Sequence, residues 1–564
     1  METYEDISPA DSRFAEQLRE RHHLTAAMAR IFAARFREHS DQAEAYLAPS
    51  MSRFVGLKEA PALPAVLDAL TSARRNAVPT LFYGDYDVDG VASTYMLYRL
   101  AQHLGLKAMY FLPSRFNEGY GLSRRIVEQA AELDYRLLFA LDCGTANLDE
   151  VNLARDRGLD VLILDHHRPV GPVPDVPLIN PHLADRLSPM CTAALAFGLA
   201  REWLAVEGES PNVADQNFLE FAALGTIADV VPLVDDSFVL AHFGMEKLPL
   251  TGNVGLQALL RALKLHKQRF LTWRDLAFSV IPCLNAAGRM AHARHAAELF
   301  LAQDDGTATE LALAMLKLNR ERKTQQSRIF DEATQQAELF PEAAVLVLYA
   351  PDWNQGITGI VASKMVDAYG RPVLIFSNSS SEEGMVVGSG RAPANCDLLA
   401  TILPLRELFK ELGGHSGAVG GGLERGRLEE LKNALADVEV ATVDTSKAKT
   451  AYDAALSPDD ILSAMVDDLQ RAYPFGEGYP PPRVLLQDAK VNRVFVVGYE
   501  KTHLALTVAG SSGAQELRVI GFQMSHLADR IREGESYDLG VELELDNFGG
   551  ELSVQLRLLE VRTT

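Results

Sequence analysis

Between Pro79 and Pro232 the chain alternates short apolar runs with longer segments in which apolar positions recur at helical spacing. That alternation is typical of βαβ units, in which parallel strands are joined by helices that cover the sheet. We therefore predict an α/β fold with a parallel sheet in this part of the chain. Its strands are predicted at Thr80–Tyr83, Arg136–Leu141 and Val161–Leu164.

Helical patterns flank this unit on both sides. Residues 1–75 and 236–340 are both rich in helix-forming residues. The second stretch contains a long polar run, Leu316–Phe330, whose charged residues favour an exposed connecting helix. We expect that helix to separate the first α/β unit from whatever follows it.

Strand patterns return in the C-terminal half. The apolar runs Ala344–Tyr349 and Pro372–Phe376 predict a second α/β unit. Farther on, Tyr537–Leu545 and Ser553–Val561 alternate apolar and polar residues at period two, across a turn that begins at Asn547. That pattern predicts an antiparallel hairpin within a small β-barrel.

These patterns divide the chain into six expected segments. A single hydrophobic core rarely grows beyond about 250–300 residues, so a chain of 564 residues needs several domains. The segments are an N-terminal helical segment (1–75), a parallel-sheet domain (76–235), a helical connector (236–340), a second α/β domain (341–440), a linker (441–473) and an antiparallel β domain (474–564).

Charge and composition restrict the classes of function. The net charge of −22 argues against a protein that coats nucleic acid through a general basic field. A phosphate-bearing ligand must therefore meet a local basic groove or bound cations. No apolar run approaches the roughly 20 residues that span a bilayer, and the acidic N-terminus does not resemble a secretory signal. We expect a cytoplasmic protein without membrane contact.

The four cysteines, Cys143, Cys191, Cys283 and Cys396, lie far apart and form no CxxC pair. That spacing does not suggest a zinc site or a redox pair. We interpret them as free, buried thiols.

Three carboxylates follow the first predicted strand at alternate positions: Asp85, Asp87 and Asp89. Such a cluster suits a hard divalent cation. A calcium loop of the EF-hand type is excluded because its twelfth position is Met96 rather than Glu, and because a strand precedes it where a helix is required. A solvated surface turn remains the alternative for this triplet taken alone.

The other predicted strands also end in potential ligands. Asp142 follows the second strand, and Asp165, His166 and His167 follow the third. The carboxyl ends of parallel strands meet at one edge of the sheet, so these side chains are expected to converge. Asp229 lies among apolar neighbours, where a metal, a helix cap or an ion pair would offset the cost of burying its charge. Mixed Asp and His ligation suits Mn²⁺ or Mg²⁺.

The motifs Gly84–Gly90, Leu141–Thr145, Asp165–His167 and Gly225–Asp229 together resemble those of the DHH phosphoesterase superfamily. Further motifs recur in the order of its RecJ family, the bacterial exonucleases that degrade single-stranded DNA from the 5′ end. These are Ser114–Leu122, Leu284–Met290, Gly388–Arg391, Gly413–His415 and Pro474–Gly478. The resemblance implies a DHH catalytic domain at 76–235, a DHHA1-like domain at 341–440 and an OB-like β domain at 474–564.

The resemblance also implies roles for individual residues. It implies two ions, Mn²⁺ or Mg²⁺, with five ligands: Asp87, Asp89, Asp142, His166 and Asp229. It implies that Asp85 lies in or beside the metal shell, that His167 faces the scissile phosphate, and that Asp165 orients a ligand histidine. It implies that four residues hold the 5′ phosphate and the adjacent backbone: Arg115, Arg289, Ser389 and Arg391. A surface salt bridge is the alternative for each arginine. Two further residues are expected to bind substrate, Asn285 and His415, and for His415 the alternative is a packed residue.

The sequence departs from the family pattern outside the metal motifs. Asn354 stands where His is usual, Ala392 where Ser is usual and Cys283 where Arg is usual, Val419 interrupts a glycine-histidine motif, and Tyr479 replaces Asn. These changes put the geometry of DNA clamping in doubt and remove no expected metal ligand.

Two further sets are ambiguous from the sequence. A basic strip on the connecting helix is either a solvated face or a DNA contact: Arg320, Arg322 and Lys323. In the last domain, four residues could form a stacking and charged surface for a single strand, although core packing explains the two aromatic residues equally well: Phe475, Tyr479, Lys501 and His503.

We expect a metal-dependent 5′ exonuclease of single-stranded DNA that serves recombination and repair. Its expected partners are single-stranded DNA, a single-strand-binding protein and a helicase, and the expected state is a monomer. One alternative is a DHH phosphodiesterase of short oligonucleotides or cyclic dinucleotides. The other is a nuclease-inactive scaffold of a replication or repair complex.

Overall fold

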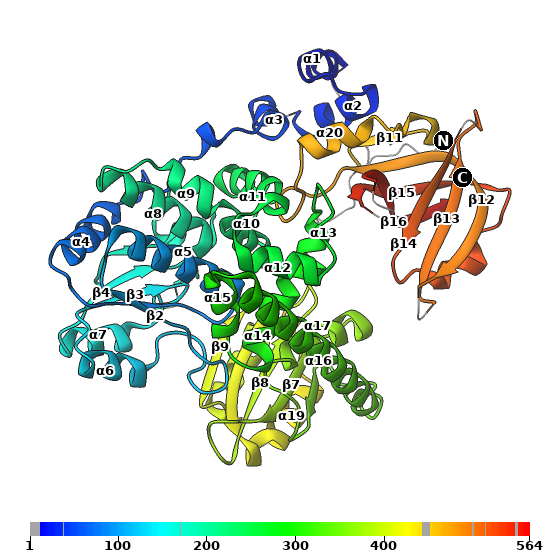
Figure 1. Ribbon diagram of the computed structural model, residues 1–564. Coiled ribbons are helices and arrows are strands. Elements are labelled where there is room, and N and C mark those ends of the chain that lie inside the picture. Colours follow the sequence, from blue (N-terminus) through cyan, green and yellow to red (C-terminus); the bar gives the residue numbers. More distant parts are fainter. Residues whose placement is uncertain are drawn as a thin grey trace.

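The structure is a computed structural model, and it describes residues 12–37, 39–169, 171–442, 452–498, 501–513, 515–547 and 551–563. Figure 1 shows an α/β unit, a body of helices beside it, a second α/β unit attached by a long helix, and a β domain at the other end. Within the described ranges, none of the helices is long and apolar enough to cross a membrane.

The N-terminal helices lie apart from the first sheet. Helices α1 (Ser12–His22), α2 (Ala26–Arg35) and α3 (Ser40–Leu47) pack near the C-terminal β domain, whereas α4 (Leu63–Arg75) leads into the first α/β unit. A partly buried ion pair between Arg35 of α2 and Asp453, with an Nη2–Oδ2 distance of 2.8 Å, ties α2 to the start of the C-terminal region.

The first sheet has the strand order β2-β1-β3-β4-β5, and all its pairings are parallel. Its strands β1 and β3 are buried along their whole length, which is why they appear in the sequence as continuous apolar runs. Residues of one parity face α5 and α8, and those of the other parity face α6 and α7. The strands are β1 (Thr80–Tyr83), β2 (Ala108–Phe111), β3 (Leu137–Leu141), β4 (Asp160–Leu164) and β5 (Leu178–Ile179); the helices are α5 (Val88–Leu104), α6 (Arg124–Glu132), α7 (Leu148–Asp156) and α8 (Thr192–Val206).

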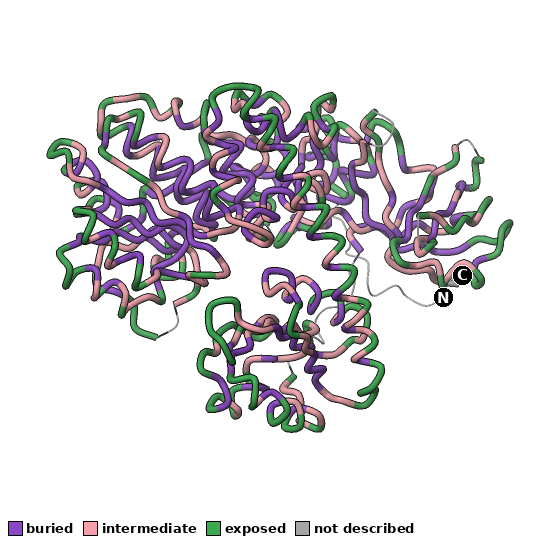
Figure 2. Tube along the Cα trace, turned by 60° about the horizontal axis from the view of Figure 1, so that its bottom comes forward, coloured by how far each residue is buried: buried purple, intermediate pink, exposed green. Residues whose placement is uncertain are grey.

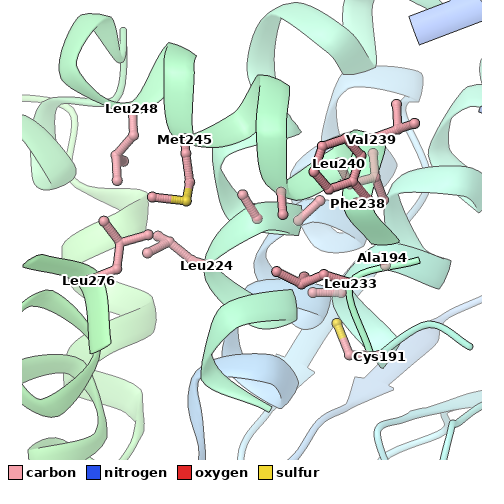
Figure 3. Close-up of a cluster of buried hydrophobic side chains, with 14 of the residues drawn as sticks. Cys191, Ala194, Leu224, Leu233, Phe238, Val239, Leu240, Met245, Leu248 and Leu276 are labelled. Atoms are coloured by element: carbon pink, nitrogen blue, oxygen red, sulfur yellow. The ribbon is translucent and has the colours of Figure 1, made fainter. Parts of the chain in front are cut away.

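A body of helices extends this core toward the middle of the chain. Figure 3 shows Leu224 of α10 packed near Met245 of α11 and Leu276, so one hydrophobic core runs from the first α/β unit into these helices. The elements are α9 (Asn212–Asn217), α10 (Leu219–Ala228), α11 (Asp235–Lys247), α12 (Val254–Ala262), α13 (Trp273–Asp275), the π-helical turn η4 (Leu276–Val280), α14 (Ile281–Met290) and α15 (Arg294–Leu301).

The long helix α16 (Asp305–Ala337) has 33 residues and is therefore about 50 Å long. Figure 2 shows it joining the larger body to the second α/β unit. The expectation that its polar stretch is exposed is wrong for one face, where Asn319, Arg322 and Gln326 are buried at helical spacing. Within the expected basic strip, Arg320 and Lys323 are exposed and Arg322 is not.

The second sheet has the order β6-β7-β8-β10-β9. Its first pair is parallel and the others are antiparallel. Helix α17 (Thr358–Tyr369) covers part of it, and α18 (Leu398–Ile402) and α19 (Leu428–Ala436) pack nearby. The strands are β6 (Leu346–Tyr349), β7 (Val373–Asn378), β8 (Met385–Arg391), β9 (Glu411–His415) and β10 (Ala418–Glu424).

The C-terminal sheet has the order β11-β12-β13-β14-β16-β15, and an additional pairing of β12 with β15 closes it into a barrel. The predicted hairpin is β15 with β16, while its predicted turn lies largely outside the described residues. Helix α20 (Met465–Arg471) precedes the barrel. The strands are β11 (Ala454–Leu456), β12 (Arg483–Val497), β13 (His503–Ala509), β14 (Glu516–Gly521), β15 (Ser536–Asp546) and β16 (Ser553–Thr563).

Candidate metal centre and phosphate-binding cleft

The acidic loop between β1 and α5 turns too tightly for larger residues. A Cβ atom on Gly90 would lie 2.6 Å from the backbone nitrogen of Asp85. Asp87 caps α5, because its side chain accepts hydrogen bonds from the backbone nitrogens of Asp89 (3.0 Å) and Gly90 (3.1 Å). The helix terminus favours this negative charge and fixes one edge of the cluster.

The N-terminus of α8 holds two more carboxylates in place. Asp89 accepts hydrogen bonds from the backbone nitrogens of Thr192 (2.8 Å) and Ala193 (2.7 Å). The hydroxyl of Thr192 donates to Asp142, with an oxygen–oxygen distance of 2.9 Å. Asp142 itself has a φ of 65°, a strained conformation that persists at functional sites when the surroundings enforce it. Thr192 thus positions two carboxylates, a role that the sequence motifs did not reveal.

The ring of His166 lies at the centre of these side chains. Its Nε2 atom is 3.7, 3.4 and 3.5 Å from carboxylate oxygens of Asp89, Asp142 and Asp229, respectively. That nitrogen is buried and has no hydrogen-bond partner among the described residues. Burial lowers the pKa of His166, which favours the neutral imidazole that binds metals.

The carboxylates are too crowded to be ionised together without cations. Burial, and then the neighbouring Asp87, raises the pKa of Asp85 to about 8. Burial, and then Asp89, raises the pKa of Asp229 to about 8. Burial and the surrounding carboxylates also raise the pKa of Asp142 well above its usual range. Divalent cations would remove this repulsion, so the buried donor set fits metal ions.

The donor atoms form two overlapping groups. Asp85, Asp87 and Asp142 bring one ligand atom each within 4.8 Å of one another, and so do Asp142, His166 and His167. Asp142 belongs to both groups. The set consists of carboxylates and imidazoles, which suits Mn²⁺ or Mg²⁺. Burial raises the pKa of the neighbouring Cys143 thiol well above its usual range.

A second pair of groups lies beside this cluster. Asp165 Oδ1 accepts a hydrogen bond from His167 Nδ1 at 2.8 Å, so the carboxylate holds His167 and not the ring of His166. Burial alone would raise the pKa of Asp165, but hydrogen bonds from His167 and Thr145 lower it to about 2. Burial opposes the charge of His167, yet the bond to Asp165 raises its pKa to about 9. His167 is therefore a cation at the edge of the cluster.

The loop after Asp229 is held by distant parts of the chain. Val230 has a φ of 53°, which is strained for a β-branched residue. The backbone of Leu233 donates to the carbonyl of Glu477 (2.8 Å) and accepts from the hydroxyl of Tyr46 (3.2 Å). The ring of Tyr46 stacks on Tyr479, with 4.0 Å between centroids.

This packing decides the role of two ambiguous aromatic residues. Phe475 and Tyr479 are buried, with exposed fractions of 1% and 3%. They belong to the core that supports the Asp229 loop and are not available to stack on a nucleobase. Core packing is therefore the correct interpretation of this pair.

Three arginines converge between the two α/β units. Burial, and then the nearby Arg115, lowers the pKa of Arg289 to about 10, and the same two causes lower the pKa of Arg391. The guanidinium of Arg115 lies over the ring of Tyr86, 4.0 Å from its centroid. Within the part of the chain that the structure describes, no carboxylate forms an ion pair with any of the three. An anion such as phosphate would relieve their mutual repulsion.

A cleft of about 330 Å³ lies beside these arginines, lined by residues of both α/β units. Arg115 and Phe116 line it from the first unit, and Thr358 and Ser389 line it from the second. The hydroxyls of Thr358 and Ser389 are 3.3 Å apart. The hydroxyl of Ser380 donates to the carbonyl of Phe116 (3.0 Å), so a direct bond joins the units at this cleft.

Two other expected substrate-binding residues, Asn285 and His415, lie in different parts of the structure. Asn285 Oδ1 accepts from the backbone nitrogen of Val88 (3.1 Å), which places it against the start of α5. His415 is exposed at the end of β9, and its Nδ1 accepts from the backbone nitrogen of Gly417 (3.2 Å). It lies in one row of the sheet with Ala418 and Arg391.

Two departures from the family pattern have structural partners, and a further site residue emerges. Asn354 accepts from the backbone nitrogen of Gly356 (2.8 Å), and the carbonyl of Gly356 accepts from Arg289 (3.2 Å). Val419 is buried in the core of the second sheet.

The half-exposed ring of Tyr120 lies against His167 with 5.3 Å between centroids, a contact that the motifs did not indicate.

Family comparisons agree with this architecture. Residues 79–226 match the DHH family, N-terminal domain; residues 342–441 match the DHHA1 domain; and residues 452–560 match the RecJ OB domain. The fold and its acidic centre are therefore those of the DHH phosphoesterase class, and the predicted fold class is confirmed.

Relatives define the family more narrowly. The chain is 30% identical over 561 residues to the single-stranded-DNA-specific exonuclease RecJ of Bacillus subtilis (strain 168), covering 98% of this chain and 70% of the relative. It is 30% identical over 527 residues to the protein of that name from Dickeya dadantii (strain 3937), covering 88% of each. The chain belongs to the RecJ family.

Solved structures show the same fold. The Mn²⁺ complex of RecJ from Thermus thermophilus superposes with a TM-score of 0.80 at 24% identity, over 99% of this chain and 79% of that one. A structure of exonuclease RecJ bound to manganese superposes with a TM-score of 0.60 at 29% identity, over 68% of this chain and 95% of that one.

Proposed function

We propose that this protein is a metal-dependent exonuclease that hydrolyses single-stranded DNA from its 5′ end, in DNA recombination and repair. The observation that carries the proposal is the juxtaposition of a crowded carboxylate–histidine centre with a cluster of arginines that have no carboxylate partner among the described residues. One group of side chains suits two cations, and the other suits a terminal phosphate.

The metal centre would be held by five residues: Asp87, Asp89, Asp142, His166 and Asp229. Asp142 belongs to both groups of converging donors and would be central to holding the ions. Asp85 lies in or beside the same shell. Two such ions, Mn²⁺ or Mg²⁺, would activate water and stabilise the attacking and leaving oxygens of a phosphodiester.

The protein side chains divide the remaining work. Asp165 keeps His167 protonated and fixes its ring, so that a positive charge faces the scissile phosphate. Thr192 keeps Asp89 and Asp142 in their places through backbone and hydroxyl hydrogen bonds. These groups are arranged before substrate binds, which is how electrostatic stabilisation becomes effective in catalysis.

The cleft favours a strand terminus. Arg115, Arg289 and Arg391 would bind the 5′ phosphate, with Ser389 and Asn285 beside them and His415 on the outer row of the sheet. The bond between Ser380 and Phe116 joins the two units at the cleft and would obstruct a strand that continued past it. An enzyme with this arrangement removes nucleotides from an end.

We also propose that the protein acts as a monomer in the cytoplasm, on strands exposed by a helicase and delivered with a single-strand-binding protein. The net charge of −22 supports delivery of the strand by other proteins, because an acidic protein does not attract DNA over long distances. The barrel domain argues against short oligonucleotides or cyclic dinucleotides as main substrates, and the intact donor set argues against a nuclease-inactive scaffold.

Hydrolysis of labelled strands tests the proposal. Purified protein with Mn²⁺ should release mononucleotides first from the labelled 5′ end of a single strand, and much more slowly from a duplex or a dinucleotide. Asp142→Ala should abolish the release. Faster turnover of the dinucleotide would favour the alternative substrate class, and equal release by Asp142→Ala would refute the metal centre.

A further inference from the structure

Asp229 differs from the other carboxylates of the metal centre in how its side chain is held. Asp89 accepts hydrogen bonds from two backbone nitrogens at the start of α8, and Asp142 accepts one from the hydroxyl of Thr192. Among the described residues, none donates a hydrogen bond to the carboxylate of Asp229, although its Oδ2 atom lies 3.5 Å from Nε2 of His166. The backbone on either side of Asp229 must therefore set the position of this ligand.

The helix that precedes Asp229 is fixed against the metal centre. Gly225, one turn earlier in α10, packs so closely that a Cβ atom there would lie 2.6 Å from Oδ1 of Asp89 and 2.4 Å from the Cβ atom of Ala193. The backbone nitrogen of Asp229 donates to the carbonyl of Gly225 (2.9 Å) and closes that turn. The helix ends at Asp229, so its packing does not fix the chain that follows.

The chain after Asp229 is strained. Val230 has a φ of 53°, and it is 65% exposed, so its own packing does little to offset the strain. Three residues later, Leu233 is 2% exposed and belongs to the same buried cluster as Cys191 and Ala194 at the start of α8 (Figure 3). Strained backbone of this kind persists only where the surroundings enforce it.

The backbone of Leu233 is bonded on both sides to segments outside the matched catalytic domain. Its N–H donates to the carbonyl of Glu477 (2.8 Å), and its carbonyl accepts from the hydroxyl of Tyr46 (3.2 Å). Tyr46 precedes residues 79–226, which match the DHH domain, and Glu477 lies within residues 452–560, which match the OB domain. Two parts of the chain that are remote in sequence thus meet at one peptide unit beside a metal ligand.

The C-terminal part of this contact depends on two glycines. Gly476 and Tyr479 exchange backbone hydrogen bonds of 2.8 and 3.2 Å, which close a tight turn in which Gly478 has a φ of 71°. A Cβ atom on Gly476 would lie 2.8 Å from Cδ1 of Leu233, and one on Gly478 would lie 3.1 Å from the Cβ atom of Pro232. Larger residues at these positions would displace the loop.

The N-terminal part depends on one hydroxyl. Tyr46 of α3 is 8% exposed, and its ring centroid lies 4.0 Å from that of Tyr479 and 4.6 Å from that of Phe238. A phenylalanine would make the same ring contacts. The hydroxyl therefore contributes its hydrogen bond to the loop, and core packing alone does not require it.

We propose that Tyr46 and residues 476–479, which we call the clamp, position Asp229 in the metal centre. Mn²⁺ affinity then depends on the docking of α3 and of the C-terminal segment onto the loop after Asp229. Without the clamp, the strained backbone at Val230 would relax and the carboxylate of Asp229 would leave the cluster. Tyr46 and Gly478 are positioning residues that act through the loop. The proposal rests on the proposed function for the identity of the ions.

Calorimetric titration of the full-length, metal-free protein with Mn²⁺ tests the clamp. Loss of a direct partner of a ligand typically costs about 10- to 100-fold in metal affinity, and Tyr46→Phe, one step farther away, should cost about 3- to 10-fold. Gly478→Ala places a methyl group against Pro232 and should cost about 10- to 100-fold. In the metal-free protein, hydrogen exchange of residues 230–234 should accelerate in both variants, because the loop opens more often.

Two control variants separate positioning from general destabilisation. Tyr537→Phe removes a buried hydroxyl that is hydrogen-bonded to the backbone nitrogen of Arg532 (2.9 Å) in the barrel domain. Gly534→Ala imposes the same left-handed strain at a φ of 89°, where a Cβ atom would meet nothing within 4 Å. Both controls can lower the Tm, but both should leave Mn²⁺ affinity within about twofold of the wild-type value, because distant sites act independently.

Hydrolysis rates supply a second readout. When Mn²⁺ is limiting, Tyr46→Phe should lose rate in proportion to its lost Mn²⁺ affinity. Saturating Mn²⁺ should restore most of the rate, and the KM for a 5′-phosphorylated strand should not change. A rate that stays low at saturating Mn²⁺ would contradict the positioning role.

Unchanged Mn²⁺ affinity in both clamp variants, or an equal loss in Gly534→Ala, would overturn the inference. The proposed function fails separately. A wild-type protein whose Mn²⁺ affinity depends on the clamp but which cleaves no DNA would refute the nuclease and keep the clamp. Cleavage of DNA with Mn²⁺ affinity that is insensitive to the clamp would do the opposite.

Discussion

The metal centre and the arginine cluster are assembled in opposite ways. The carboxylates and histidines come mainly from the ends of β1, β3 and β4, and backbone nitrogens at helix ends fix several of them. The arginines come from a loop of the first unit, from α14 and from β8 of the second unit. Two of them donate to backbone carbonyls, and the third lies over Tyr86.

The difference separates chemistry from substrate placement. One region gathers negative charge around one edge of a single sheet, where hydrogen bonds hold Asp89 and Asp142 in place. The other gathers positive charge across two units and is complete only when those units are correctly placed. Changes in the first should therefore affect metal binding and turnover, and changes in the second should affect substrate affinity alone.

Asp142→Ala should have the largest effect, because it removes the one carboxylate common to both groups of donors. We expect at least about a 10³-fold loss of hydrolysis, together with loss of tight Mn²⁺ binding. Initial rates and calorimetric Mn²⁺ titration measure the two effects. Asp149→Ala, at an exposed acid nearby, is the control and should change neither.

Arg391→Ala changes the arginine cluster and should weaken substrate binding without affecting the metal centre. A charge-assisted hydrogen bond contributes roughly 1.5–3 kcal/mol, so we expect the KM for a 5′-phosphorylated strand to rise about 10- to 100-fold. The Mn²⁺ affinity of Arg391→Ala should stay within about twofold of the wild-type value. The control variant, Arg427→Ala, should also keep its Mn²⁺ affinity within about twofold of that value. A parallel loss of metal affinity in Arg391→Ala would show that the two regions are not independent.

Thr192→Val should have a smaller effect on the metal side. The substitution keeps the shape and the backbone bond to Asp89 but removes the hydroxyl that donates to Asp142. Loss of a hydrogen bond to a metal ligand typically lowers metal affinity about 10- to 100-fold. We expect Thr192→Val to lower Mn²⁺ affinity by the smaller of these factors. Retained Mn²⁺ affinity with a raised KM would contradict the positioning role of Thr192.

Dependence of stability on pH should show the smallest effect. Asp85 and Asp229 have folded pKa values of about 8, above the value near 4 of an unfolded carboxyl. Their contribution to stability is therefore complete below about pH 4 and is lost as pH rises toward 8. Metal-free protein should have a lower Tm at about pH 8 than at about pH 5. Because Mn²⁺ requires ionised ligands, the stabilisation that it adds should grow over that range. If calorimetry gave the same difference in Tm between the Mn²⁺-bound and metal-free protein at every pH in this range, the prediction would be contradicted.

Much of the fold was predictable because the signals are local. Apolar runs such as Val161–Leu164 indicate buried parallel strands, and the rule that their ends meet brings Asp142 and His166 to one edge. Thr192 was missed because an uncharged residue at a helix start carries no such signal. The roles of Tyr479 and Arg322 depend on which distant elements pack against them, and a pattern along the chain does not contain that information.

Anomalous diffraction from crystals soaked in Mn²⁺ tests the central claim most directly. Two peaks about 3.5–4 Å apart should lie at the carboxyl edge of the first sheet, with Asp142 among the ligands. The Arg391→Ala protein should give the same two peaks. A single ion, or ions that do not contact Asp142, would contradict the account.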